Sequence, residues 1–118
     1  MFLDLNHTKL KAYKHSRKFV VEVYKLAKEL PADEKYAISQ QIRRAALSVH
    51  LNMAEGSSRK SNVERKRFFE ISRGSIIEVD AALDIAQDLY YLEKYDTSVL
   101  GFEMAEVYKL VSGLINAE

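Results

Sequence analysis

The sequence contains no cysteine, a single proline and only four glycines among its 118 residues. The missing cysteines exclude a disulfide scaffold, a thiolate metal site and a cysteine nucleophile. Because proline and glycine are the residues that most often end a helix, the chain has few places to interrupt one. No apolar run approaches the roughly 20 residues of a transmembrane helix, and the N-terminus lacks the basic-then-apolar pattern of a signal peptide. We therefore expect a cytoplasmic protein with no membrane partner.

The composition is that of a globular chain. Hydrophobic residues make up 47% of it and charged residues 30%, enough for one core and a charged surface. A chain of this length predicts one domain over residues 1–118. The 18 basic residues nearly cancel the 17 acidic ones, so net charge alone does not indicate a nucleic-acid or membrane binder.

Apolar residues recur at spacings of three and four along the whole chain, and no segment alternates convincingly with period two. This pattern predicts an all-α fold. Pro31, the Gly56 to Ser58 stretch and a weaker break near Lys94 divide the chain into four blocks. We expect helices at about 6–30, 33–55, 61–93 and 97–116. Short connections between helices of this length favour an antiparallel up-down four-helix bundle.

Several residues mark the expected helix ends. Asp33 and Glu34 suit the positive end of the second helix. Gly56 can take the left-handed conformation that closes that helix. Ser61 and Glu64 form the signature of a capping box at the start of the third helix.

Small residues mark the middle of the third helix. Its predicted core face contains Phe68, Ser72, Ser75, Val79, Leu83, Ala86 and Tyr90. Gly74 lies beside this face, and a glycine inside a helix costs about 1 kcal/mol relative to alanine. We therefore expect a neighbouring helix to approach closely at Gly74 and Ser75.

A polar row accompanies the apolar stripe of the second helix. Its members are Gln41, Ser48, Asn52 and Glu55. The favoured interpretation is structural, with Asn52 and Glu55 stabilising the turn from Gly56 to Lys60. The alternative is a row that binds a ligand or partner.

Some apolar residues are left over after each helix has been given one core stripe. Leu47, Leu51 and Ala54 project opposite the core stripe of the second helix, and Ile77 falls among charged residues of the third. Scattered surface apolar residues are common on monomers. Two such sites on the central helices nevertheless favour self-association.

Charge is distributed unevenly along the chain. Basic residues are concentrated in residues 1–31 and 43–73 and acidic residues in 74–118, where Asp80, Asp84 and Asp88 form a ridge at helical spacing. The basic cluster comprises Arg43, Arg44, Arg59, Lys60, Arg65, Lys66 and Arg67. In one interpretation this cluster meets the acidic ridge of another subunit, a heterologous contact that can close into a ring. In a second, it binds RNA or DNA phosphate. A solvated surface that does neither is the third.

We find no constellation typical of an enzyme. His7, His15 and His50 have no metal-type spacing with carboxylates, and the acidic ridge does not converge on a point. There is no Gly-rich phosphate loop and no nucleophile elbow. We expect no catalytic residue, metal, cofactor or small-molecule substrate.

The residues of the second and third helices resemble a known family. The run from Gln41 to Val49 (QIRRAALSV), the segment from Asn52 to Gly56 (NMAEG) and Arg59 are similar to the signature of the four helix bundle protein family, also called the 23S rRNA-intervening sequence protein family. Phe68, followed by Gly74, Ser75 and Glu78, resembles the second signature of that family. The likeness is strongest over residues 31–92.

The resemblance implies a reading frame that can be encoded within an intervening sequence of bacterial large-subunit ribosomal RNA. It implies a cyclic pentamer of four-helix protomers, similar in fold to the accessory variability protein of diversity-generating retroelements. The resulting hypothesis is a non-enzymatic, ring-forming protein that binds nucleic acid or a ribonucleoprotein partner through the basic cluster. The alternative is a structural homo-oligomeric scaffold or adaptor for a protein partner, with the basic cluster used in subunit contacts.

Overall fold

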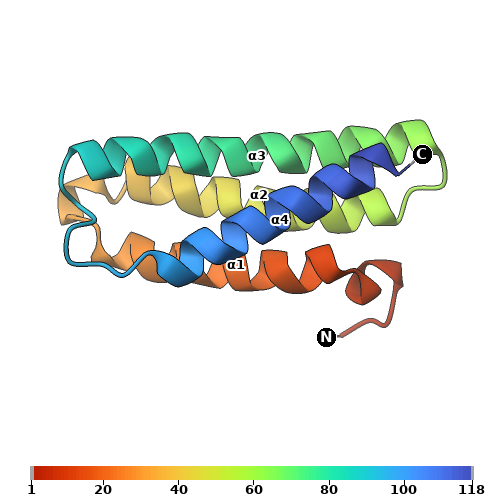
Figure 1. Ribbon diagram of the computed structural model, residues 1–118, viewed down its shortest axis with the longest axis horizontal. Helices are drawn as coiled ribbons and strands as arrows, with labels where there is room; N and C mark the ends of the chain where they lie inside the picture. The colour runs from red at the N-terminus through yellow and green to blue at the C-terminus, as the bar shows by residue number, and fades with distance from the viewer. Residues whose placement is uncertain (1, 118) are drawn as a thin grey trace.

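All four expected helices form in the computed structural model, which describes residues 2–117 (Figure 1). They are α1 (Lys11–Glu29), α2 (Ile38–Ser57), α3 (Asn62–Asp88) and α4 (Ser98–Asn116), with short 3₁₀ turns η1 (Asn6–Lys9) and η2 (Ala32–Glu34). The described residues contain no strand, and neighbouring helices pack against each other, so the all-α four-helix prediction is confirmed. The α2–α3 turn lies at one end of the molecule, and the other two connections lie together at the opposite end (Figure 1).

The first two helices begin later than predicted. Leu10 is extended, with ψ 138°, and separates η1 from α1. Leu30 is also extended, so α1 ends just before Pro31 as expected. Asp33 and Glu34 lie in η2 rather than at the start of α2, because the non-helical Ala37 (φ −121°, ψ −106°) delays that helix to residue 38. The prediction that these two acids begin the second helix is therefore wrong.

The two ends of α3 are set by different local features, a side-chain cap at the start and a left-handed residue at the end. At its start the Ser61 hydroxyl accepts a hydrogen bond from the Glu64 backbone N–H at 3.1 Å, which confirms the capping prediction. Its end comes at Asp88, earlier than predicted, because Tyr90 adopts a positive φ of 64°. The Tyr91 N–H then donates to the Ala86 carbonyl at 3.0 Å. This left-handed residue closes the helix in the manner usual for glycine.

The core lies along the axis between the four helices. Its largest fully buried side chains are Phe19, Leu26, Ile42, Met53, Ile76 and Leu100. On α3 the buried aromatic residue is Phe69 rather than the predicted Phe68, which is half-buried. Tyr90, also predicted on the core face, is exposed. The rest of the predicted stripe is buried or half-buried, so the predicted core face is confirmed except at its two ends: Ser72, Ser75, Val79, Leu83 and Ala86.

Small polar side chains join α2 to α3 in the centre of the molecule. The buried Ser72 hydroxyl donates to the Val49 carbonyl at 2.7 Å, and the Ser75 hydroxyl donates to the Ser48 hydroxyl at 2.9 Å. Short side chains at these positions let the two backbones approach closely. The predicted close approach at Ser75 is present.

Two glycines have roles that the sequence assigned differently. Gly74 is exposed, and a Cβ added there would meet no atom within 4 Å, so the close approach predicted at this glycine is wrong. No glycine among the described residues has a positive φ, so Gly56 is not a left-handed helix cap. It is buried inside α2, and a Cβ there would lie 2.8 Å from the Phe69 ring and 3.0 Å from Phe68 Cβ. The close α2–α3 contact that requires glycine is therefore at residue 56.

Candidate binding surfaces

Two arginines of the predicted basic cluster stabilise the α2–α3 turn. Arg65 donates through one terminal nitrogen to the Arg59 carbonyl at 2.9 Å and the Lys60 carbonyl at 2.7 Å. Arg59 donates to the Glu55 carboxylate at 2.9 Å, and its guanidinium carbon lies 4.9 Å from the centre of the Phe68 ring. Both side chains are half-buried and make specific contacts within the chain. Their first role is therefore structural.

Three other cations surround the same turn. Lys60 and Arg67 are exposed, and the half-buried Lys66 lines a hollow of ≈250 Å³ shared with η1 and the end of α4. None of the three forms an ion pair within residues 2–117. Their positive charge is therefore directed to the solvent at this end of the molecule.

Arg43 and Arg44 are not part of this group. They lie in the first half of α2, whereas the α2–α3 turn follows the last residue of that helix. Arg44 is exposed, whereas Arg43 is half-buried and its Nε donates to the Ser39 carbonyl at 3.1 Å. The seven predicted cations thus fall into two groups separated along the helix axis.

The predicted self-association residues also occupy separate surfaces. Leu47, Leu51 and Ile77 are 39%, 55% and 54% exposed, while Ala54 is half-buried. Ile77 and the exposed Asp80 line a groove between α3 and α4, to which the two α2 leucines do not contribute. Two different apolar surfaces are therefore open to solvent on one protomer.

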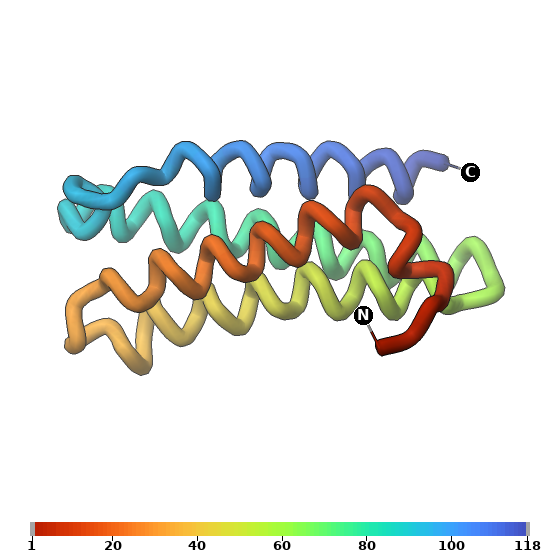
Figure 2. The backbone as a smooth tube through the Cα atoms, turned by 90° about the horizontal axis from the view of Figure 1, so that it is seen from below, coloured from red at the N-terminus to blue at the C-terminus, as the bar shows by residue number. Residues whose placement is uncertain are grey.

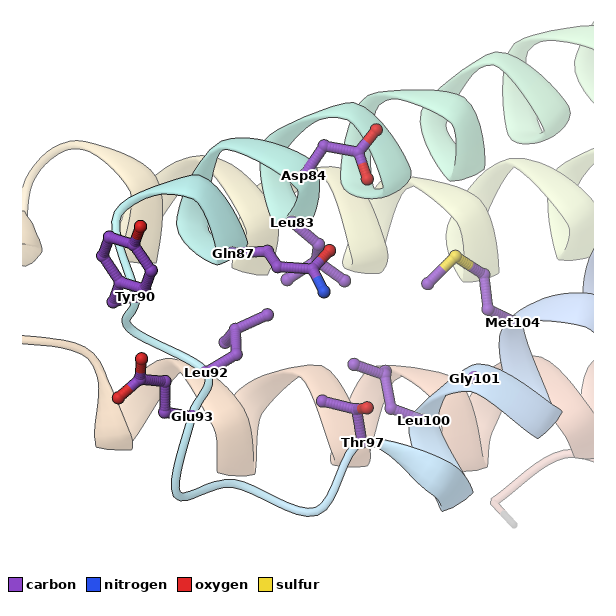
Figure 3. A pocket seen from close by; sticks show the side chains of 10 residues that line it. All are labelled: Leu83, Asp84, Gln87, Tyr90, Leu92, Glu93, Thr97, Leu100, Gly101 and Met104. Atoms are coloured by element: carbon purple, nitrogen blue, oxygen red, sulfur yellow. The ribbon is translucent and has the colours of Figure 1, made fainter.

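Another hollow opens beside the α3–α4 connection, with a volume of ≈490 Å³ (Figure 3). Its interior is apolar and is formed by Leu83, Leu92, Leu100 and Met104. Tyr90 and Glu93 lie at one end, and Asp84 of the acidic ridge lies on the α3 side (Figure 3). Asp88, the last residue of the ridge, is exposed and does not line this hollow.

The polar row of α2 serves several different contacts. Gln41 donates to Glu78 at 3.1 Å, and Ser48 accepts the hydrogen bond from α3 described above. Glu55 binds Arg59 and so stabilises the turn. Asn52 instead donates to the Ser48 carbonyl at 2.9 Å within its own helix. The structural interpretation therefore fits Glu55, but Asn52 does not contact the turn.

Sequence reasoning missed a partly buried polar pair between α1 and α4. The Glu103 carboxylate is only 5% exposed and lies 2.8 Å from Nδ1 of His15. A signal was present, because Glu103 falls three residues after Leu100 and four before Val107, both fully or almost fully buried. A charged residue at such a position predicts a buried partner on a neighbouring helix.

His50 belongs to a second polar cluster that the sequence did not predict. Its Nδ1 lies 2.6 Å from the hydroxyl of the fully buried Ser16, and its ring packs against Tyr13 with centroids 4.7 Å apart. Burial, together with the positive charge of Arg17 and the nearby His7, lowers the pKa of His50 below 6.5. The neutral imidazole is therefore favoured in the folded protein.

This lowered pKa predicts a loss of stability in mild acid. The unfolded chain takes up a proton near pH 6.5, while folded His50 does not, so the stability is complete above that pH and falls as the pH decreases toward the lower native pKa. Replacing His50→Asn, which keeps a short polar group near Ser16, is expected to flatten this dependence. Urea unfolding between about pH 7.5 and about pH 5.5 measures it. Parallel curves for the two proteins would contradict the assignment.

Within residues 2–117 no three histidine or acidic side chains converge into a group that could hold a metal ion. No helix in that part of the chain combines the length and the apolarity needed to cross a membrane.

The fold and these surfaces define a four-helix, all-α protein with a basic turn and exposed apolar side chains. The chain belongs to the 23S rRNA-intervening sequence protein family, whose sequence model matches residues 8–113. This match confirms the resemblance seen in the signature residues of α2 and α3. No match is found among curated proteins.

Proposed function

We propose that this protein is a non-enzymatic nucleic-acid-binding protein whose contact surface is the α2–α3 turn. The observation that supports the proposal is that the cations of this turn have two different roles. Arg59 and Arg65 fix the backbone of the turn, while Lys60, Lys66 and Arg67 have no ion-pair partner in the described part of the chain. A rigid turn with unpaired cations suits phosphate contacts, which position a nucleic acid without reading its sequence.

Neutralising these three cations is expected to weaken binding strongly. With three phosphate contacts to a single strand, affinity should fall about 20-fold between about 50 and 200 mM salt. The variant Lys60→Gln/Lys66→Gln/Arg67→Gln should lose most of this salt dependence and bind at least about 20-fold more weakly at the lower salt. Fluorescence anisotropy with labelled single-stranded RNA and DNA measures both effects.

A matched variant separates this site from net charge. Lys18→Gln/Arg44→Gln/Lys94→Gln removes the same charge from three exposed residues away from the turn. It should bind within about threefold of the wild-type protein, since only general electrostatic attraction is reduced. Equal losses in the two variants, or no binding by the wild-type protein at about 50 mM salt, would refute the proposal.

A second candidate function is that of a homo-oligomeric scaffold for a protein partner, built from up-down protomers in a cyclic ring, for which a pentamer is the proposed state. It is favoured by the two exposed apolar surfaces, one at Leu47 and Leu51 and the other at Ile77. A ring uses two different surfaces of each subunit, as these are. In this proposal the acidic ridge meets basic residues of the next subunit.

Reversing the charge of Asp84 is expected to dissociate such a ring. Asp84→Lys should lower the mass measured by light scattering during size exclusion toward the 13.6 kDa of one chain. The control is Glu70→Lys, which makes the same charge change at an exposed site elsewhere on α3. An unchanged mass for Asp84→Lys would exclude this pairing, and a wild-type mass of one chain would exclude the ring.

A further inference from the structure

A further hollow, of ≈410 Å³, is lined by residues of α1, of the α1–α2 connection and of α2. The α1–α2 connection, orange in Figure 2, lies at the opposite end of the molecule from the α2–α3 turn. Its volume falls within the range of about 300–1,000 Å³ that is usual for ligand pockets. The lining residues include Tyr24, Lys28, Pro31, Lys35, Ser39 and Arg43.

The charge lining this hollow has one sign. Lys28, Lys35 and Arg43 all contribute to it, and no carboxylate does. None of the three forms an ion pair within residues 2–117. Three cations around one concave site attract an anion of more than one negative charge.

Arg43 is the best-positioned of the three. It is half-buried, and its Nε donates to the Ser39 carbonyl at 3.1 Å, which orients the guanidinium. Ser39 is itself fixed, because its hydroxyl donates to the Ala27 carbonyl at 3.3 Å. The terminal nitrogens of Arg43 have no acceptor in the described part of the chain. A carboxylate and a phosphate group can each accept two parallel N–H donors from such a fork. The phosphate carries the larger negative charge and therefore suits the three cations of this hollow better.

The acidic residues of the same connection do not neutralise this charge. The Glu34 carboxylate accepts a hydrogen bond from the Tyr91 hydroxyl at 2.9 Å, which directs it toward the α3–α4 connection. Asp33 does not line the hollow. The negative end of α1 and the positive end of α2 meet at this corner, so their helix dipoles largely cancel. The three side chains therefore set the local potential.

The remaining lining suits a flat ring. Tyr24 is 36% exposed, and Pro31 lines the same hollow together with the buried Ala27 and Leu30. An exposed tyrosine ring is a platform on which a nucleobase can stack, and such stacking tolerates any base.

We propose that this hollow binds a phosphate monoester carried on a planar aromatic base. Arg43, Lys28 and Lys35 bind the phosphate, and the base stacks on the ring of Tyr24. Two sources share this chemistry, a free mononucleotide and the 5′-phosphorylated end of a nucleic-acid strand. The site does not depend on the proposed function of the α2–α3 turn, because it uses none of the same residues.

The first experiment titrates isotope-labelled protein with adenosine 5′-monophosphate, adenosine or inorganic phosphate and follows backbone amide resonances. The nucleotide should produce saturable shifts at residues 24–43. It should also bind about tenfold or more tightly than adenosine alone or inorganic phosphate alone. No saturable shift in this segment would overturn the proposal. Equal affinity for inorganic phosphate and the nucleotide would also overturn it, because the base would then make no contact.

Adjacent arginines provide a matched pair of variants. Arg43→Gln should weaken nucleotide binding about tenfold, whereas Arg44→Gln removes the same charge one residue away, outside the hollow, and should change it less than about twofold. Arg43→Lys keeps the charge without the fork and should give an intermediate loss, which keeps the test valid if Arg43→Gln unfolds. Tyr24→Leu should remove the preference for the nucleotide over phosphate. Equal losses at residues 43 and 44 would refute the site.

A final comparison distinguishes the two sources. A 5′-phosphorylated trinucleotide that binds at least as tightly as the mononucleotide, and more tightly than its 5′-hydroxyl form, assigns the site to strand ends. A mononucleotide that binds while both trinucleotides fail assigns it to free nucleotides. The Lys60→Gln/Lys66→Gln/Arg67→Gln variant should bind the mononucleotide normally, so this site and the turn can fail independently.

Discussion

Replacing Gly56→Val is expected to lower the free energy of unfolding by about 3 kcal/mol, which urea denaturation measures. The physical reason is the contact between α2 and α3. An added Cβ would lie 2.8 and 2.9 Å from two ring carbons of Phe69 and 3.0 Å from Phe68 Cβ. The Phe69 ring is only 5% exposed and cannot move into solvent, and Phe68 Cβ moves only with its backbone. Valine adds two methyl groups to this crowded point.

Alanine substitutions at two glycines provide the internal control. Gly74→Ala adds a methyl group on an exposed face with no atom within 4 Å, so it should raise stability by up to about 1 kcal/mol through helix propensity alone. Gly56→Ala should lower stability by about 1 kcal/mol, because the clash exceeds the small propensity gain near a helix end. A stabilising Gly56→Ala would show that α2 and α3 separate easily at this point.

Removing the imidazole of His15 is expected to destabilise the protein by about 2 kcal/mol. In His15→Ala the Glu103 carboxylate, 5% exposed, loses the nitrogen that lies 2.8 Å away. A buried polar group without its partner costs more than the intact bond contributed. Because 26% of the His15 side chain is exposed, water reaches the site, and the cost stays below that of a fully buried pair.

The double variant His15→Leu/Glu103→Leu tests whether the loss comes from the unpaired carboxylate. Replacing both partners with apolar residues removes the desolvated charge and should restore stability to within about 1 kcal/mol of the wild-type protein. Chemical denaturation measures the free energy of unfolding of the single and double variants, and a double-mutant cycle then gives the interaction energy of the pair. A double variant as unstable as His15→Ala would instead assign the effect to lost packing between α1 and α4.

Interactions between neighbouring residues made the α-helices predictable. The packing of the helices against each other decided which side of each helix is buried. The Ser61–Glu64 pair and Pro31 act within one turn of the backbone, so their effects could be predicted from adjacent residues. Phe68 and Phe69 are neighbours with the same propensity, and only the rotation of α3 against α2 decided that Phe69 is buried. The close approach lies at Gly56 rather than at Gly74 for the same reason, since close approach is a property of two helices together.

The candidate binding surfaces were predictable in composition but not in arrangement. Charge counting singled out the cations around residues 59–67, which lie close together in sequence and therefore in space; their role as a binding site stays a prediction. It also joined Arg43 to them, although about 20 Å of helix separates residue 43 from the turn at 1.5 Å per residue. It missed the hollow that Arg43 shares with Lys28 and Lys35, because that hollow exists only where two helices meet.

The sequence by itself determined that this chain forms four helices, where α3 and α4 begin, where α1 and α4 end, and which family the chain belongs to. These properties depend on hydrophobic periodicity and on short-range capping, both of which act within a few residues. Only the tertiary structure decided which cations are used inside the turn, which remain open to a ligand, and that Glu103 has a histidine partner. Those outcomes depend on contacts between residues as far apart in sequence as His15 and Glu103, which helix packing alone brings together.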